Sequence, residues 1–330
     1  MFLKKIILLS LLTIIVSSCG GGGSSSQSPE ANINSPSTPS NPGTSSNLVT
    51  SNLIDHATGT INGEISYGDI NREFILYVPL TYNDLTKQPL VFNFHGYGSN
   101  ALEQMNYGDL RSQADIDGFI LIHPEGLDDI FGSSYWNIGG WSRSEHDDVE
   151  FIQNTINLLM DKYSINADKI YSTGMSNGGF FSFHLACNLS ASFAAIASIT
   201  GSMSYETFDN CSARKPTPTL QIHGSFDAVV PYKGLDSTMK PILDVMEYWK
   251  ENNGCDDYIL SEPSILPSTS SWTKTYLYDN CLNGTQNIHL YVQGAGHIWP
   301  GSVYEAISDP NTSQRVWDFF SKYDINGVIQ

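Results

Sequence analysis

The stretch IYSTGMSNGGFF, residues 170–181, sets a serine among glycines and between two apolar segments. Its core GMSNG (174–178), centred on Ser176, fits the pattern Gly-x-Ser-x-Gly, in which the serine stands on a sharp turn between a strand and a helix. A pattern this short also occurs by chance in glycine-rich loops. The elements around it, and their order along the chain, decide between these two interpretations.

The elements next to Ser176 are of the kind that such a turn requires. KIYSTG before it predicts a strand, and GGFFSFHLACNL after it predicts a helix. Elsewhere short apolar runs alternate with segments of helical periodicity. The other predicted strands are 72–80, 89–98, 118–126, 193–201, 218–227 and 287–297. The other predicted helices are 148–163, 239–254 and 313–323. This alternation predicts an α/β fold with a mostly parallel sheet covered by helices on both faces. In such a fold, ligands bind beyond the carboxyl ends of the strands.

A serine nucleophile needs a base, and the base needs an acid to orient it. In the strand order predicted here the acid follows the serine and the histidine follows the acid. Asp227 directly follows a predicted strand, and His297 follows the last one. Asp209 and Asp236 lie nearby in sequence, but neither directly ends a strand. Ser176, Asp227 and His297 are therefore the predicted catalytic residues.

Other histidines have simpler interpretations. His289 lies inside a strand and His184 lies on the helix after Ser176, so both are expected to be structural. We expect His223 to stabilise the turn before Asp227, and His95 to shape the loop FHGYGS (94–99).

That loop also matters for the oxyanion that forms when a serine attacks a carbonyl. Two backbone N–H groups bind it, one from the residue after the nucleophile and one from a loop after an early strand. Asn177 is the first predicted donor. Tyr97 is the second, with Gly98 as an alternative.

The acidic stretch EHDDVE (145–150) raises the question of a metal site. Asp147 and Asp148 are adjacent and so point in different directions from a helix. A helix N-cap followed by a first-turn acid explains them better. The chemistry predicted for Ser176 requires no metal and no cofactor.

The N-terminus has the layout of an export signal. Residues 1–19 combine two lysines, a short apolar run and the ending VSSC, which resembles the lipobox of bacterial lipoproteins and makes Cys19 the expected site of acylation. An ordinary signal peptide with a coincidental cysteine is the alternative. Residues 20–47 are rich in Gly, Ser and Pro and predict a disordered linker. The expected domain is 48–330, in an exported bacterial protein at the outer membrane, at the cell surface or in the periplasm.

The net charge limits the choice of partners. The chain carries 16 Lys and Arg against 34 Asp and Glu, whereas nucleic acid and anionic membranes need a basic surface. We therefore expect no nucleic-acid partner, and membrane contact only through an N-terminal lipid.

Four cysteines follow Cys19, which in an exported chain suggests disulfides. Three connectivities are possible. Cys187–Cys211 with Cys255–Cys281 is our hypothesis because each pair closes a short loop.

Taken together, the motifs resemble the secreted esterase/polyhydroxybutyrate depolymerase family, a branch of the α/β-hydrolases that includes feruloyl and acetylxylan esterases of carbohydrate esterase family 1. The resemblance covers about residues 58–322, and the stretches that carry it are REFILYVP, FHGYGSNA, HPEGL, DDVEFI, YSTGMSNGG, FAAIASITG, HGSFDAVVPY, NGC and GAGHIWPG. It implies ester hydrolysis by a triad of Ser176, Asp227 and His297.

The resemblance is less specific about the substrate. Feruloyl or acetyl esters on plant polysaccharide fragments are the first expectation, and polyhydroxybutyrate or another polyester is the second. Trp299 is a candidate for lining the acyl pocket, and Trp136 and Trp141 for framing its mouth, with packing roles as the alternative. A non-catalytic surface binding protein on a hydrolase fold is the alternative from another class.

Overall fold

The structure is a computed structural model that describes residues 49–67, 69–262, 264–265 and 272–330. Asn47–Gln330 form one compact unit. The expected signal segment, Cys19 and the linker lie outside the described residues.

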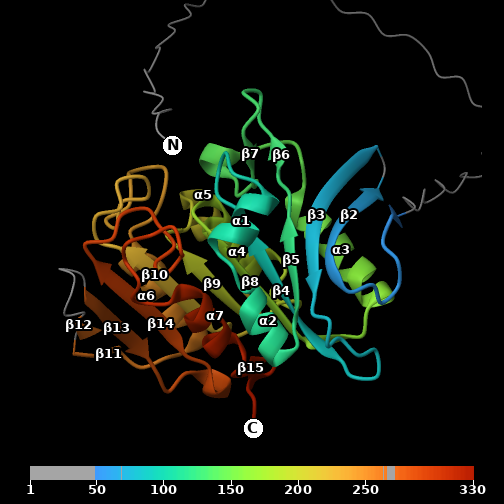
Figure 1. The fold of residues 1–330 in the computed structure, drawn as a ribbon. Coiled ribbons are helices and arrows are strands. Elements are labelled where there is room, and N and C mark those ends of the chain that lie inside the picture. The colour runs from blue at the N-terminus through green and yellow to red at the C-terminus, as the bar shows by residue number, and fades with distance from the viewer. Residues whose placement is uncertain (1–48, 68, 263, 266–271) are drawn as a thin grey trace, which may run out of the picture. The chain divides into compact units, whose positions relative to one another are not determined.

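Twelve of the described strands form a single sheet, in the order β1-β2-β3-β5-β4-β8-β9-β10-β14-β13-β11, with β12 pairing on β13 (Figure 1). Their bounds are β1 Thr50–Ser51, β2 Gly59–Tyr67, β3 Ile70–Val78, β4 Gln88–Phe94, β5 Ile120–Pro124, β8 Ile165–Met175, β9 Ala195–Ile199, β10 Thr219–Gly224, β11 Ile259–Leu260, β12 Ser264–Ile265, β13 Trp272–Tyr278 and β14 Asn287–Gln293. Two small two-stranded sheets complete the strands, β6 Leu127–Asp128 with β7 Ser134–Tyr135, and β15 Tyr323–Asp324 with β16 Gly327–Val328.

The sheet has a parallel centre and antiparallel flanks. The neighbours β5, β4, β8, β9, β10 and β14 are all parallel to one another. On one side β3 joins β5 antiparallel and β2 joins β3, and on the other side β13 joins β14 antiparallel. The predicted α/β class is therefore confirmed, and the antiparallel flanks extend the predicted parallel sheet.

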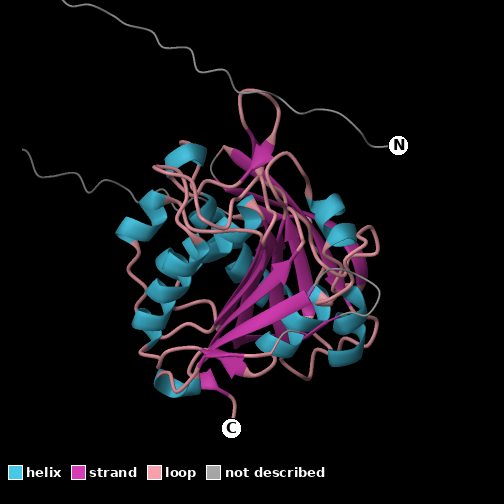
Figure 2. Ribbon diagram, turned by 90° about the vertical axis from the view of Figure 1, so that its left-hand side faces the viewer, coloured by secondary structure: helices cyan, strands magenta, loops and turns pink. Residues whose placement is uncertain are grey.

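Helices cover both faces of the sheet, as Figure 2 shows. They are α1 Ala101–Tyr107, α2 Arg111–Asp117, α3 Asp148–Lys162, α4 Asn177–Asn188, α5 Tyr205–Asn210, α6 Ile242–Asn253 and α7 Thr312–Phe320, with short 3₁₀ turns η1 Gly140–Ser142 and η2 Leu282–Gly284. One buried cluster joins the sheet to α3 and α4, another joins it to α2 and α7, and a third lies between α4 and α6. Central strands contact apolar layers on both sides, which is why β5 is buried along its whole length.

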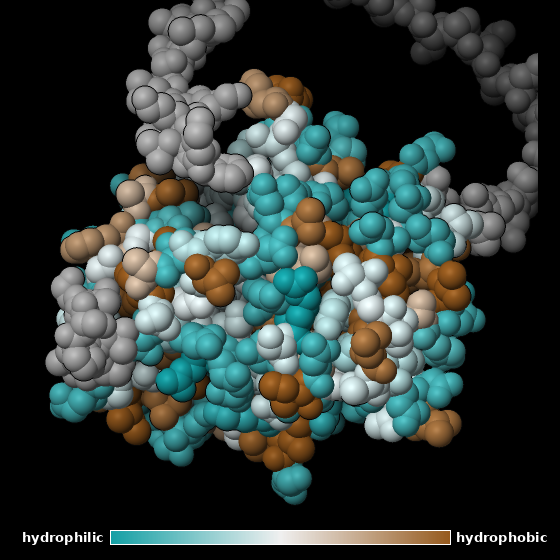
Figure 3. Space-filling view, viewed as in Figure 1, coloured by the Kyte–Doolittle hydropathy of each residue, from teal (hydrophilic) through white to brown (hydrophobic). Residues whose placement is uncertain are grey.

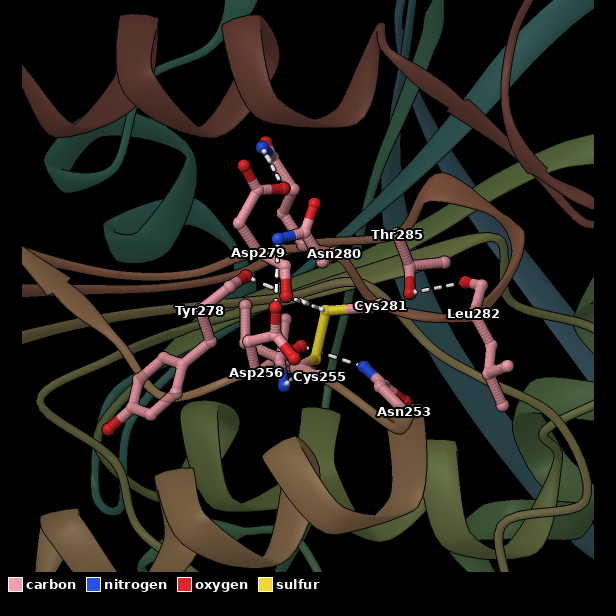
Figure 4. The surroundings of a disulfide bond; sticks show 12 residues. Asn253, Cys255, Asp256, Tyr278, Asp279, Asn280, Cys281, Leu282 and Thr285 are labelled. Carbon is pink, nitrogen blue, oxygen red and sulfur yellow. Dashed lines mark hydrogen bonds between the residues drawn. A yellow bond between two sulfur atoms is a disulfide. The ribbon is translucent and has the colours of Figure 1, made fainter.

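Both disulfides are formed. Cys187 on α4 is bonded to Cys211, the C-cap of α5, and Cys255 after α6 is bonded to Cys281 after β13. Figure 4 shows the second bond, where Cys255, two residues after Asn253 at the end of α6, is joined to Cys281. Each bond thus ties a helix or a helix end to a segment more than twenty residues away. Disulfides persist in oxidising compartments, which is consistent with an exported protein.

The molecular surface mixes hydrophilic and hydrophobic residues over the face seen in Figure 3. The hydrophobic tip at the top of that view is the β6–β7 hairpin, where Ile130 and Phe131 are 93% and 84% exposed. Among the described residues, the helices are too short or too polar to cross a bilayer.

Candidate active site

The three loops predicted to carry chemistry follow neighbouring strands of the parallel centre. Ser176 comes directly after β8, Asp227 comes three residues after β10, and His297 comes four residues after β14. Strands β8, β9, β10 and β14 lie side by side and run in the same direction, so their carboxyl ends meet at one edge of the sheet (Figure 1).

Ser176 stands on a sharp turn. Its backbone lies at φ 54° and ψ −121°, a conformation that residues other than glycine rarely adopt. Ser176 is also the N-cap residue of α4. Its N–H donates to the carbonyl of Ile199 at 2.8 Å, which fastens the turn to β9. The helix then begins at once, so its N-terminal N–H groups gather beside the serine.

Glycines make this turn possible because the chain passes very close to itself. A Cβ on Gly178 would lie 2.2 Å from the carbonyl oxygen of Phe94, and one on Gly174 would lie 2.7 Å from the carbonyl of Gly178. A Cβ on Gly96 would lie 3.2 Å from the Cβ of Ser176. The loop after β4 is therefore packed directly against the serine.

The structure brings Asp227 and His297 into direct contact across 70 residues of sequence. His297 Nδ1 lies 2.8 Å from Asp227 Oδ2, and the Asp227 side chain is fully buried. The other carboxylate oxygen, Oδ1, accepts the N–H groups of Val229 and Val230 at 2.9 and 2.8 Å. Within the described residues, His297 makes no hydrogen bond to Ser176 Oγ. In enzymes free of substrate such bonds are often long and tighten only in the reacting complex.

Burial alone would raise the pKa of Asp227, but the hydrogen bond and charge of His297 and the Val230 N–H lower it, and the lowering prevails. Asp227 is therefore a carboxylate at neutral pH. An ionised Asp227 beside Nδ1 holds the proton of a neutral His297 on that nitrogen and leaves Nε2 free to accept another.

Of the two predicted oxyanion donors, Asn177 directly follows Ser176, and Tyr97 follows Gly96, whose Cα lies close to the serine. Asn177 is the first residue of α4, and its side chain is fixed because Oδ1 accepts the Trp136 N–H at 2.6 Å and Nδ2 donates to the Trp136 carbonyl at 3.2 Å. The Gly98 N–H donates to the Ser134 carbonyl at 2.8 Å, so this alternative donor is already engaged. Tyr97 remains the candidate in this loop.

The histidines that were expected to be structural are hydrogen-bonded, and all are buried except His184, which is half-buried. His184 Nδ1 lies 2.9 Å from Thr207 Oγ1, and His289 lies 2.8 Å from the Tyr232 hydroxyl. His95 joins its own loop to the next one, since Nδ1 lies 2.8 Å from the Gly96 carbonyl and Nε2 accepts the Gly126 N–H at 3.0 Å. His223 lies 2.8 Å from the Val230 carbonyl in the turn after Asp227.

Two of the three tryptophans do not face a pocket. Trp136 is fully buried between Phe94 and Phe181, and its indole N–H donates to the His95 carbonyl at 3.0 Å. Trp299 is also fully buried, and its indole N–H donates to Ser313 Oγ at 3.2 Å. The expectation that they line or frame a substrate pocket is thereby corrected to a packing role. Sequence position alone placed them near the site and carried no information on burial.

Trp141 differs from both, because it is 41% exposed. Its ring packs edge-on against Phe180 of α4 and lies 6.4 Å from the ring of Tyr97, which is 48% exposed and in turn lies near Tyr135. Three neighbouring rings that are at least partly exposed, Tyr97, Tyr135 and Trp141, thus lie next to the first turns of α4 through Phe180.

The acidic stretch before α3 has structural roles for both aspartates. Asp147 is the N-cap of α3 and accepts the Glu150 N–H at 2.9 Å. Asp148 is buried, forms an ion pair with Arg72 at 2.7 Å and accepts the Asn137 N–H at 2.7 Å.

Sequence analysis missed Glu125, which supports the loop after β4. One carboxylate oxygen accepts the Ala101 N–H at 2.7 Å, and the other accepts the Ser134 hydroxyl at 2.9 Å. Burial raises the pKa of Glu125. The only signal in the sequence was an acidic residue directly after a buried strand, in HPEGL.

A parallel centre with helices on both faces, antiparallel flanks and a serine on a strand-to-helix turn defines an α/β-hydrolase. The chain belongs to the Phospholipase/Carboxylesterase family, whose model matches residues 81–265.

Curated relatives are esterases. Bifunctional acetylxylan esterase/xylanase XynS20E of Neocallimastix patriciarum is 26% identical over 271 residues, which are 82% of this chain and 36% of that protein. Feruloyl esterase B of Piromyces equi is 26% identical, over 77% of this chain and 46% of that protein. The chain thus spans less than half the length of these two relatives. Feruloyl esterase D of Neurospora crassa is 24% identical, over 80% of this chain and 87% of that protein.

A solved structure shares the fold. The acetyl xylan esterase from Aspergillus awamori superposes with a TM-score of 0.56 at 16% identity, over 83% of this chain and 99% of the other. The chain therefore belongs to a carboxylesterase family of the α/β-hydrolase class and has feruloyl and acetylxylan esterases as distant homologues.

Proposed function

We propose that the protein is a serine carboxylic-ester hydrolase in which Ser176 is the nucleophile, His297 the general base and Asp227 the acid that orients it. The observation that carries this proposal is the 2.8 Å contact between His297 Nδ1 and Asp227 Oδ2, on the loops after β10 and β14, at the same edge of the sheet as the strand-to-helix turn of Ser176. Membership of a carboxylesterase family supports it independently.

In the proposed reaction Ser176 Oγ attacks the ester carbonyl carbon while its proton passes to His297 Nε2. Asp227 stabilises the imidazolium that forms. The backbone N–H groups of Asn177 and Tyr97 bind the negative oxygen of the tetrahedral intermediate. Collapse of the intermediate expels the alcohol, which takes the proton from His297. A water molecule then attacks the acyl-enzyme while His297 accepts its proton. The carboxylic acid is released, and His297 returns the proton to Ser176.

For the substrate, we propose feruloyl or acetyl esters on plant polysaccharide fragments. The support is the activity of the esterases to which the chain is similar, together with the exposed rings of Tyr97 and Trp141, which lie 6.4 Å apart and offer an apolar surface to an acyl group. Hydrolysis of polyhydroxybutyrate or another polyester is the second candidate. A panel of methyl ferulate, acetylated xylan and hydroxybutyrate oligomers separates them by kcat/KM.

The protein is also proposed to be exported and held at a bacterial surface by acylated Cys19, with residues 20–47 as a tether and 48–330 as the catalytic domain. Metabolic labelling with a radioactive fatty acid tests this directly. Label on the wild-type chain that disappears in Cys19→Ala is the expected result.

The alternative from another class is a surface binding protein without catalysis. Turnover of p-nitrophenyl acetate by wild type, Ser176→Ala and Asp227→Asn separates the two. We expect hydrolysis by the wild type, none above background with Ser176→Ala, and a loss of several orders of magnitude with Asp227→Asn. Unchanged turnover in Ser176→Ala would remove the enzyme assignment as stated.

A further inference from the structure

The turn that carries Asp227 is held from behind by a buried histidine. His223 is the fifth residue of β10 and is completely buried. Its Nε2 lies 2.8 Å from the carbonyl oxygen of Val230 and 3.5 Å from Asp227 Oδ2. Val230 is also the residue whose N–H binds the other oxygen of the same carboxylate. The imidazole thus contacts the one peptide segment that fixes the direction of the Asp227 side chain.

The neighbouring hydrogen bonds determine which nitrogen of His223 carries the proton. Gln221 Nε2 lies 3.0 Å from the backbone carbonyl of Gly201, an acceptor, so this atom of the amide is the donating nitrogen. The same Nε2 lies 3.0 Å from His223 Nδ1. Because an amide nitrogen only donates, Nδ1 accepts, and the ring proton of a neutral His223 is on Nε2. It points to the Val230 carbonyl and lies beside Asp227.

The ring is also kept uncharged. Burial lowers the pKa of His223 to about 4, against the opposing effects of the backbone carbonyls of Val230 and Gly201 and of the charge of Asp227. The other groups that face the ring are His297, which also lowers the pKa of His223, and the ring of Tyr232 at 5.9 Å. At neutral pH His223 therefore carries no charge that would compete with His297 for the Asp227 carboxylate.

We propose that His223 is a positioning residue for ester hydrolysis: its Nε2–H, directed by Gln221, holds the Val230 carbonyl and so fixes the carboxylate that orients His297. This inference rests on the proposed function, because it assigns His223 a role only if His297 acts as the general base and Asp227 orients it. His223 touches neither substrate nor the reacting atoms. Its effect passes through the position of Asp227.

Positioning has a kinetic signature that general stabilisation lacks. A displaced Asp227 leaves substrate binding intact but misaligns His297 in the transition state, so kcat falls while KM changes little. A misplacement of about 1 Å costs on the order of 100-fold in rate.

The test compares His223→Leu with His223→Gln on p-nitrophenyl acetate, with kcat and KM measured separately. Leucine has no donor for the Val230 carbonyl, and we expect kcat to fall about 10- to 100-fold with KM within about twofold. Glutamine carries an N–H donor at a similar reach, and we expect it to restore kcat to within about threefold of wild type. Gln221→Leu, which removes the group that directs the ring, is expected to lower kcat in the same direction.

His123→Leu is the matched control. His123 is a fully buried histidine of β5, its ring nitrogens have no hydrogen-bond partner among the described residues, and burial lowers its pKa to about 3. Its replacement tests the general effect of removing a buried imidazole, and we expect kcat within about twofold of wild type.

The outcomes are distinct. Wild-type kcat in folded His223→Leu, with Asp227→Asn inactive, overturns the positioning role and leaves the proposed function standing. A loss in His223→Gln as large as in His223→Leu overturns it too, because the restored donor has then made no difference. Full activity in Asp227→Asn instead contradicts the proposed function itself. If His223→Leu does not fold, the comparison of His223→Gln and Gln221→Leu with wild type decides.

Discussion

At the scale of single residues, the ion pair between Arg72 and Asp148 connects strand β3 to the first residue of helix α3. Both side chains are buried, with Nη1 and Oδ1 2.7 Å apart, and the guanidinium lies over the ring of Phe151 at 3.9 Å. Asp148 also accepts the Asn137 N–H, in the segment that leads from Trp136 to α3. The pair therefore fixes the segment whose Trp136 backbone holds Asn177.

Arg72→Met is expected to lower the free energy of unfolding by about 3–5 kcal/mol, because it leaves Asp148 as a buried charge without its partner. Arg72→Met combined with Asp148→Asn removes both charges and keeps an acceptor for Asn137. We expect the double variant to recover at least half of the loss. Urea denaturation of the wild type, both single variants and the double variant measures the coupling. Strictly additive losses would show that the pair is not coupled.

Candidate catalytic residues could be selected from the sequence where the residue type and its position after a predicted strand limited the choice. Ser176, Asp227 and His297 were selected by their positions after predicted strands, and the structure places the last two in contact. Burial was not readable in this way. Trp136 and Trp299 looked equivalent to Trp141, yet of these three only Trp141 is exposed. Phe94 and Phe181, which pack against Trp136, and Tyr107, which contacts Trp299, are all distant in sequence from the tryptophan that they cover.

At the scale of elements, the turn between β8 and α4 depends on glycine at a position where the backbone of Phe94 leaves no space. Gly178→Ala is expected to lower the free energy of unfolding by at least 1–3 kcal/mol and to reduce kcat/KM more than 100-fold, because relief of the 2.2 Å clash displaces Ser176.

Gly132→Ala is the matched control for this prediction. Gly132 has a positive φ of 76°, but a Cβ there would meet no atom within 4 Å. We expect about 1 kcal/mol of backbone strain and unchanged kcat/KM. Equal effects of the two alanines on activity would mean that close packing at the serine turn is not what matters.

The disulfide between α4 and α5 closes a loop over a sequence separation of 24 residues. By the loop-entropy model its removal through Cys187→Ser with Cys211→Ser is expected to cost about 3 kcal/mol of unfolding free energy. The equivalent change at Cys255 and Cys281, with a separation of 26 residues, is expected to cost a similar amount. Denaturation midpoints with and without reductant measure both. A midpoint of the wild type that does not respond to reduction contradicts the prediction.

Elements with strong periodicity were predicted well, and those without it were missed. The helix expected at 148–163 is α3, and the strand expected at 193–201 contains β9. Strand β2 was not predicted, although its residues alternate between the two faces, because Gly63 interrupts the apolar face at an inward position, where the ring of Phe74 fills the space that a side chain would need. Helices α1, α2 and α5 have six or seven residues each, too few for a periodic pattern to emerge.

At the scale of the whole molecule, five of the described histidines are kept neutral by their surroundings, four of them buried and His184 half-buried. Burial lowers the pKa of His95, His184 and His223 to about 4, and of His123 and His289 to about 3. In the unfolded chain each would titrate near 6.5. Between about pH 6.5 and 4 the unfolded state therefore binds more protons than the folded state, and folding is destabilised as the pH falls.

We expect the free energy of unfolding to be highest above about pH 7 and to drop steeply below pH 6. Each neutral buried histidine contributes a slope of up to about 1.4 kcal/mol per pH unit in this window. Urea denaturation at half-unit steps from pH 4.5 to 8 gives the slope. His123→Leu removes one such histidine, and we expect it to lower the number of protons taken up on unfolding, and with it the slope of the unfolding free energy against pH, by about one proton. A flat profile between pH 5 and 7 would show that these histidines are not kept neutral by folding.

The sequence predicted the parallel centre of the molecule better than its edges. Strands buried on both faces are continuous apolar runs, which are easy to recognise. The flanking strands β2 and β13 carry polar residues on one face, and their pairing depends on contacts with β3 and β14 that only the folded chain defines. For the same reason, the hydrogen bonds that link Gln221, His223 and Asp227 were not predictable from their spacing.

The central claim is that Ser176 forms a covalent acyl-enzyme with the help of His297 and Asp227. Its most direct test is reaction of the wild-type protein with a fluorophosphonate probe, followed by peptide mass spectrometry to locate the phosphonylated residue. We expect one stoichiometric adduct on Ser176, formed at least 100-fold more slowly in His297→Ala, and no adduct in Ser176→Ala. An adduct on another residue, or ester hydrolysis that persists after Ser176 is fully modified, would contradict the account.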